Sequence, residues 1–206
     1  MKNFILFISV LFLSTTINNK TVSEYNRFNL IVLDKLEEAD KVQYSEVDSL
    51  HIVIGDSQSP YIANASEKAK LLSSIGSESS LWLGGKTVSW LIGALNKYKV
   101  NKEVSSIILS IGTNGGFGKF IKDDVTKLIS LVNEKFPNAK VYVVQGSWGW
   151  GGLKNIKESE VRTYYQKYKD LGVVIVEPPI GNIEPHGNKP IYKVIGRNLD
   201  SLISLN

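Results

Sequence analysis

From about residue 50 to the end of the chain, short apolar runs alternate with longer amphipathic segments. The runs typical of strands are Ile52–Ile54, Ser80–Leu83, Ile107–Ile111, Val141–Gln145 and Val173–Val176, of which Ser80–Leu83 has the weakest pattern. The segments with helical spacing are Tyr61–Leu72, Val88–Tyr98, Ile121–Phe136, Ile156–Tyr168 and Pro190–Ile203. Strand–helix alternation predicts a parallel sheet covered on both faces. We therefore expect an α/β fold, a three-layer α/β/α sandwich with a flavodoxin-like sheet of about five parallel strands.

Glycine and polar residues follow each predicted strand. In chain order these loops contain Gly55-Asp56-Ser57, Gly84-Gly85-Lys86-Thr87, Gly112-Thr113-Asn114, the Gly146–Gly152 segment with Trp148 and Trp150, and Glu177 running on to His186. Loops that follow parallel strands gather at the carboxyl edge of the sheet, where open α/β sheets bind their ligands. The sequence therefore predicts that a serine, a glycine, an asparagine and a histidine meet at one edge.

These four residue types are those that acyl transfer requires. Ser57 is a candidate nucleophile, and His186 is a candidate base that returns its proton to the leaving alcohol. The Gly85 backbone N–H and the Asn114 side-chain amide are candidate donors to the oxyanion of the transition state. Each motif also has a structural alternative. Asp56 and Ser57 suit a helix cap, Gly84 and Gly85 could simply break the strand, Asn114 suits a turn, and His186 could be an exposed residue at the start of a helix.

In these loops the chain resembles the SGNH, or GDSL-like, hydrolase family of serine esterases and lipases, from Ile52 to the last helix. Gly55-Asp56-Ser57 is similar to the family's nucleophile block, Gly85 lies in its glycine block, Asn114 in its asparagine block and His186 in its histidine block. The resemblance implies a flavodoxin-like fold and ester hydrolysis without metal or other cofactor, with Ser57, Gly85, Asn114 and His186 in the roles given above.

The chain departs from the family pattern at one position. The family usually has an aspartate three residues before the histidine, and that position is Ile183, which cannot accept a hydrogen bond from the imidazole. Glu184, Glu177 or a backbone carbonyl remain as acceptors that would orient His186, and a bare Ser–His dyad is a further alternative. We favour Glu184 over Glu177 because it lies in the same loop, and we give a backbone carbonyl at least equal weight. The departure also motivates an alternative, a catalytically inactive SGNH-like domain that binds a glycan.

Trp148 and Trp150 lie among glycines in a loop beside the predicted site. Such rings can stack on a sugar or contact an acyl chain, so both are candidate substrate-binding residues; the alternative is that they anchor the loop. With them, the sequence favours an esterase that removes small acyl groups, such as acetyl, from a small-molecule or polysaccharide ester of a carbohydrate or cell-wall type. A nucleotide or flavin binder is disfavoured, because no loop matches a phosphate-cradling motif.

Composition narrows the possible partners. The 206 residues carry a net charge of +4 from lysines scattered along the chain, with no basic block that would indicate nucleic-acid binding. There is no cysteine, which excludes disulfides and thiolate metal sites, and there are only two histidines, His51 and His186. His51 begins a predicted core strand, and we expect it to be structural.

The first residues have the layout of a secretory signal. Lys2 precedes an apolar run over residues 4–13 and small polar residues to Thr16, which is too short a segment for a spanning helix. We expect a signal peptide over residues 1–16, a helical extension over 17–49 and the SGNH-like domain over 50–206. We therefore expect a secreted, periplasmic or cell-envelope protein that is not stably inserted in the membrane. The alternative is that residues 1–16 are an uncleaved anchor or a buried strand.

Overall fold

The computed structural model describes residues 51–71, 81–178, 184–187 and 189–205. The predicted signal peptide and helical extension, and Ile183, lie outside this range. The strands are β1 (His51–Gly55), β2 (Lys70–Leu71), β3 (Ser106–Ser110), β4 (Lys140–Val144) and β5 (Val174–Val176). The α-helices are α2 (Ser59–Ala65), α3 (Val88–Lys97), α4 (Val125–Lys135), α5 (Glu158–Asp170) and α6 (Lys189–Ser204), with two 3₁₀ turns, η1 (Thr113–Gly115) and η2 (Gly151–Leu153).

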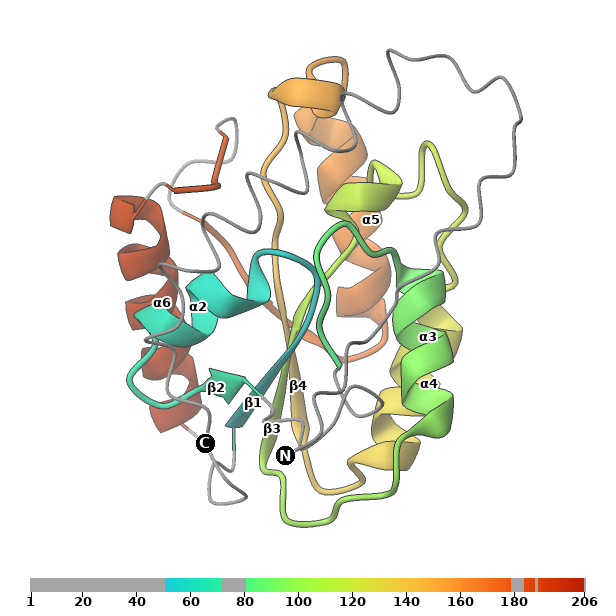
Figure 1. Ribbon diagram of the computed structural model, residues 1–206, viewed down its shortest axis with the longest axis vertical. Helices are drawn as coiled ribbons and strands as arrows, with labels where there is room; N and C mark the ends of the chain where they lie inside the picture. Colours follow the sequence, from blue (N-terminus) through green and yellow to red (C-terminus); the bar gives the residue numbers. More distant parts are fainter. Residues whose placement is uncertain (1–50, 72–80, 179–183, 188, 206) are drawn as a thin grey trace, which may run out of the picture.

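The five strands form one parallel sheet in the order β2-β1-β3-β4-β5. Helices α2 and α6 cover one face, and α3, α4 and α5 cover the other (Figure 1). The strands alternate accordingly: Ile52 and Ile54 pack with the three-helix face, whereas Val53 packs with α2 and α6. The predicted three-layer α/β/α sandwich with a flavodoxin-like five-stranded sheet is confirmed.

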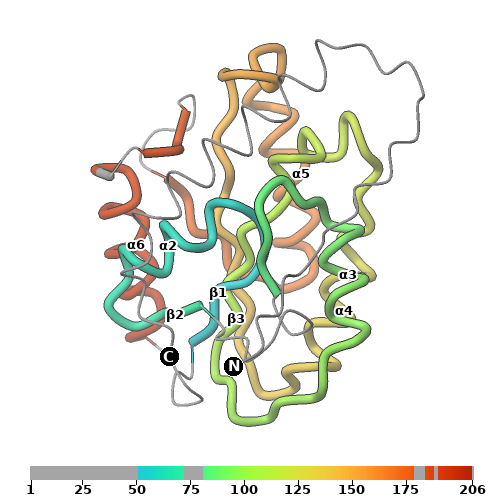
Figure 2. The backbone as a smooth tube through the Cα atoms, in the orientation of Figure 1, coloured from blue at the N-terminus to red at the C-terminus, as the bar shows by residue number. Residues whose placement is uncertain are grey.

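The strand order reverses between β1 and β3, which are neighbours in the sheet although β2 lies between them in the sequence. Residues 51–55 of β1 pair in register with residues 106–110 of β3, so that Gly55 is opposite Ser110. A Cβ atom on Gly55 would lie only 2.0 Å from the Ser110 carbonyl oxygen, and the Gly55 φ is +135°. Glycine is therefore required where the chain leaves β1, and the loops after β1 and β3 begin side by side (Figure 2).

The predicted helix over Tyr61–Leu72 is wrong in its second half. Helix α2 ends at Ala65, and Lys70–Leu71 forms the edge strand β2. The Glu67 N–H donates to the Asp200 carboxylate, and the Ala69 N–H donates to the Ser66 hydroxyl. Because side chains of Ser66 and Asp200 take the N–H groups that would extend the helix, the chain turns into β2 instead.

The weak strand predicted at Ser80–Leu83 is replaced, over its described residues, by a single bridge between Trp82 and Gly55. Two backbone hydrogen bonds accompany it, from Gly55 N–H to the Leu81 carbonyl and from Leu83 N–H to the Gly55 carbonyl. This bridge places the segment before Gly85 alongside the end of β1. The remaining predicted strands and helices are present with ends that differ by a few residues; α4, for example, begins only after Asp124, whose carboxylate accepts from the Lys127 N–H.

No helix within the described ranges is long and apolar enough to cross a membrane.

Candidate active site

The structure brings Ser57 and His186 into direct contact, although they are far apart in the sequence. Ser57 Oγ lies 3.1 Å from His186 Nε2, at the carboxyl edge of the sheet. Ser57 follows β1 by two residues, and His186 lies in the loop before α6. Both are largely shielded from solvent, with 9% of Ser57 and 17% of the His186 side chain exposed. A histidine at this distance can accept the serine proton.

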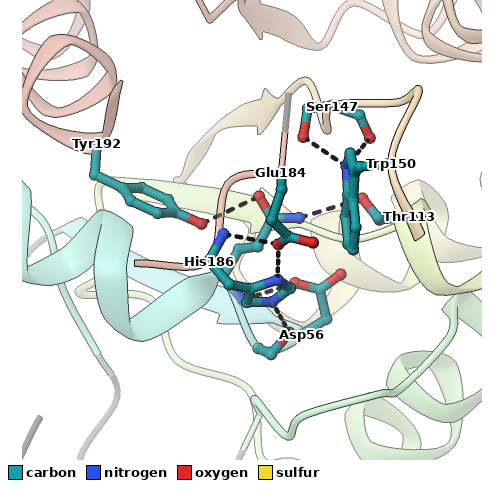
Figure 3. A network of polar contacts seen from close by, with 9 residues as sticks. Asp56, Thr113, Ser147, Trp150, Glu184, His186 and Tyr192 are labelled. Atoms are coloured by element: carbon teal, nitrogen blue, oxygen red, sulfur yellow. Dashed lines mark hydrogen bonds and ion pairs between the residues drawn. The ribbon is translucent and has the colours of Figure 1, made fainter. Parts of the chain in front are cut away.

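Glu184 occupies the other side of the imidazole. Its Oε1 atom lies 2.6 Å from His186 Nδ1, and the same oxygen accepts from the His186 backbone N–H at 3.0 Å (Figure 3). A carboxylate at Nδ1 favours the tautomer whose hydrogen is on Nδ1, which leaves the Nε2 lone pair for the Ser57 hydroxyl. Among the acceptors considered from the sequence, Glu184 is the one whose carboxylate contacts His186.

Asn114 lies in η1, directly after β3, and faces both the β1 loop and the glycine loop. Its Nδ2 atom donates to the Lys86 carbonyl at 3.0 Å and lies 3.4 Å from Asp56 Oδ2. Lys86 is the residue after Gly85, which is exposed and has a φ of +71°. The structure thus brings the glycine and asparagine loops together beside the residue that precedes Ser57.

The two tryptophans have different environments. Trp148 is buried in the hydrophobic core with the helices of the α3–α5 face, which favours the loop-anchor alternative. Trp150 is half-buried, and its indole N–H donates to the backbone and side-chain oxygens of Ser147. Its ring meets the His186 ring edge-on, with centroids 5.5 Å apart. Figure 3 draws both side chains. Trp150 is thus in contact with a predicted site residue.

Asp56 is a site residue whose importance the sequence did not indicate beyond a possible cap. Its Oδ1 atom accepts from the Gln58 backbone N–H at 3.0 Å and from the Ser110 hydroxyl at 3.3 Å. Burial raises the pKa of Asp56 to about 6, against the opposing effects of the Gln58 N–H, the His186 charge and the Ser110 hydroxyl. Gly-Asp-Ser is read from the sequence as a nucleophile motif, but only the fold shows that its aspartate is fully enclosed.

Within the described ranges no group of three or more histidine, aspartate or glutamate side chains is arranged to hold a metal ion. His51, at the opposite end of β1, contacts the Ser106 hydroxyl through Nδ1 at 3.0 Å, a contact between neighbouring strands away from the site.

Comparison with known proteins defines the class of fold. No protein-family model and no curated protein matches the sequence. Among solved structures, a member of the lipolytic protein G-D-S-L family from Veillonella parvula is 13% identical with a TM-score of 0.51, over 74% of this chain and 97% of the other.

Two further structures are similar. A protein from Streptococcus pneumonia described as a candidate platelet activating factor is 14% identical with a TM-score of 0.53, over 92% of this chain and all of the other. A candidate acylhydrolase from Bacteroides fragilis is 12% identical with a TM-score of 0.50, over 82% and 91%. At such identities the likeness is one of fold, and at that level the resemblance to the GDSL-type hydrolases is confirmed.

The buried charge of Asp56 generates a prediction on stability. The pKa of Asp56 is raised from 3.8 to about 6 in the folded state. Its contribution to the free energy of unfolding is therefore fully present below about pH 4, where the group is protonated, and is lost as the pH rises through 6. At about 1.4 kcal/mol for each pKa unit, the carboxylate costs about 3 kcal/mol at pH 8. Asp56→Asn should therefore unfold at higher denaturant than the wild type at pH 8, and at similar denaturant at pH 4.

Urea unfolding at the two pH values tests this prediction. Asp170→Asn, an exposed helix position, serves as the control and should change neither value. An Asp56→Asn protein that is less stable than the wild type at pH 8 would show that the hydrogen bonds to the charged carboxylate outweigh its desolvation.

Proposed function

We propose that this chain is a serine ester hydrolase that removes small acyl groups, such as acetyl, from a carbohydrate or cell-wall-type ester. The observation that carries the proposal is the continuous contact from Ser57 Oγ to His186 Nε2 and from His186 Nδ1 to Glu184. A nucleophile, a base and an acceptor that orients the base form the arrangement on which acyl transfer depends. The GDSL-type fold supports the same class of reaction.

The proposed reaction begins as Ser57 Oγ attacks the ester carbonyl carbon while its proton passes to His186 Nε2. The tetrahedral intermediate collapses when His186 returns that proton to the leaving alcohol, and the acyl group stays on Ser57. Water then attacks the acyl-serine with His186 again as base, which releases the acid and restores the serine hydroxyl. Glu184 keeps the imidazole oriented in both halves.

The negative charge on the carbonyl oxygen requires hydrogen-bond donors. We assign the Gly85 N–H and the Asn114 amide, and the proximity of Asn114 Nδ2 to Lys86 and Asp56 supports this assignment. One amide hydrogen is directed to Lys86 and the other toward Asp56 at 3.4 Å, so we expect the second to be shared with an oxyanion when a substrate is bound. Such contacts commonly tighten only when the substrate is bound.

Trp150 supports a carbohydrate ester as the substrate. Its indole N–H is held by Ser147, so its ring is fixed against His186 beside the attacking serine. A rigid aromatic ring there offers an apolar face to a sugar. The alternative, a catalytically inactive SGNH-like domain that binds a glycan, was motivated by Ile183; the contact of Glu184 with His186 supports the enzyme instead, because it supplies the missing acceptor.

We also propose that the protein is secreted or held in the cell envelope. The apolar run after Lys2 supports this location, and N-terminal sequencing of natively produced protein tests it.

The activity is tested with a panel of acetylated sugars and short-chain aryl esters, together with a fluorophosphonate probe. We expect the wild type to turn over acetyl esters and to be labelled at Ser57, since only an activated serine reacts. Ser57→Ala should abolish both signals, while Ser89→Ala, at an exposed position on α3, should retain them. A wild type that neither hydrolyses any ester nor reacts with the probe would favour the glycan-binding alternative.

The oxyanion assignment predicts a loss of rate without a loss of binding. Asn114→Ala should lower kcat by about a hundred- to a thousandfold and change KM little, because the amide acts mainly in the transition state. Asn138→Ala, which removes an exposed amide, is the control. If Asn114→Ala turns over as fast as the wild type, Asn114 has no part in the mechanism.

The role of Glu184 is tested by comparing two substitutions. Glu184→Gln keeps an oxygen that can accept from His186 Nδ1–H, and because the Glu184 side chain is 47% exposed its charge is screened; we expect less than about a tenfold loss of kcat. Glu184→Ala removes the acceptor and should cost more. Glu177→Gln, the other carboxylate considered, should have no effect.

Steady-state kinetics on one aryl acetate compares these variants with His186→Ala, which should abolish turnover. If Glu184→Gln is as damaging as His186→Ala, the charge of Glu184 is essential. If His186→Ala remains active, the histidine assignment is wrong.

A further inference from the structure

We propose that Gln58 is a positioning residue whose side-chain amide holds the nucleophile loop in register with the Asn114 loop and with helix α6. The proposal rests on the proposed function, because it concerns the same site. Gln58 directly follows Ser57, and no sequence motif points to it.

The Gln58 amide bridges two other parts of the chain. Its Nε2 donates to Thr113 Oγ1 at 3.3 Å, and the Tyr192 hydroxyl donates to its Oε1 at 3.4 Å. All three side chains are buried, and Tyr192 lies on α6. Burial raises the pKa of the Tyr192 phenol well above its usual value, so it remains a neutral donor. One amide thus connects the loops after β1 and β3 to the last helix.

The hydrogen bond from Gln58 to Thr113 connects Gln58 with the proposed oxyanion donor, Asn114. Thr113 precedes Asn114 in η1, and Gly146 lies close to its hydroxyl, because a Cβ atom on Gly146 would be only 2.3 Å from Thr113 Oγ1. The loop after β4 therefore approaches Thr113 closely. A shift of Thr113 would move Asn114 relative to Ser57.

The hydrogen bond from Tyr192 to Gln58 connects Gln58 with the surroundings of His186. The Tyr192 ring stacks on Tyr61 of α2 with centroids 5.1 Å apart, and the Tyr61 ring meets His186 edge-on at 6.4 Å. Figure 3 shows the Tyr192 hydroxyl directed toward the centre of the polar network that contains His186. The same helix that bonds to Gln58 also begins just after the His186 loop.

The buried polar bridge has a physical consequence that an apolar side chain would not have. An amide enclosed without partners is costly, so Gln58 is satisfied only where Thr113 and Tyr192 lie on its two sides. Its backbone is also fixed, since the Gln58 N–H donates to Asp56 Oδ1. The amide therefore selects one relative placement of the three segments, where a leucine would tolerate several.

The first test measures the steady-state kinetics of Gln58→Leu. This substitution removes both hydrogen bonds of the side chain and replaces it with one of similar volume. Small displacements of reacting groups can cost about a hundredfold, so we expect kcat to fall by about ten- to a hundredfold while KM changes by less than about threefold. Ile203→Ala, at the far end of α6, removes buried apolar volume and should lower stability without lowering kcat. Tyr192→Phe should reduce kcat in the wild type but add nothing to Gln58→Leu, because its hydroxyl acts through Gln58.

The second test does not depend on turnover. Nitrogen-15 NMR of the imidazoles is simple here, because the chain has only His51 and His186. Gln58→Leu should change the His186 signals and leave those of His51, at the other end of β1, unchanged; Ile203→Ala should change neither. If Gln58→Leu does not fold, Tyr192→Phe and Thr113→Val each remove one of the two hydrogen bonds of the Gln58 amide. Their kcat and His186 signals then provide the same test.

Unchanged His186 signals together with a kcat within about twofold of the wild type would overturn the positioning role. A wild type inactive on every ester would instead overturn the proposed function, and the imidazole signals would then decide the positioning role alone.

Discussion

The pairing of β1 with β3 is the constraint on which the site depends. These strands are adjacent where the strand order reverses, and their last residues, Gly55 and Ser110, face each other so closely that only glycine fits. The loops that leave them therefore begin together and diverge to opposite faces of the sheet. Such a switch point is where open α/β sheets bind ligands, and here the backbone alone sets the loop that carries Ser57 beside the loop that carries Asn114.

Asp56 connects this backbone constraint to the candidate active site at a cost in stability. Enclosure raises the pKa of Asp56 to about 6, so the carboxylate is mostly charged at neutral pH and its burial lowers the stability of the fold. It nevertheless accepts hydrogen bonds from the β1 loop and from the end of β3. Sites of reaction commonly retain such unfavourable groups because they orient others. The hydrophobic layers on both faces of the sheet provide the free energy that permits this charge to stay buried.

The sequence predicted those features that arise from local patterns. Four core strands were predicted because they are continuous apolar runs, and loop order predicted that Ser57 and His186 meet at one edge, where they are in contact. Strand β2 was missed because two residues carry no periodicity, and its turn depends on Asp200, more than 130 residues away. Gln58 was missed for a similar reason: its partners Thr113 and Tyr192 meet it only in the fold.

His186 and Asn114 are positioned in different ways. The acceptor that orients His186 lies two residues before it, whereas Asn114 is bonded to Lys86, 28 residues away in the sequence. Glu184 and His186 are separated only by Pro185, which restricts Glu184 to an extended backbone. One carboxylate oxygen then reaches both the His186 backbone N–H and Nδ1, so the loop fixes the ring with few long-range contacts. Glu184 is half exposed, so solvent screens its charge. Under the proposed function, Glu184 would then act on the imidazole mainly through hydrogen-bond geometry.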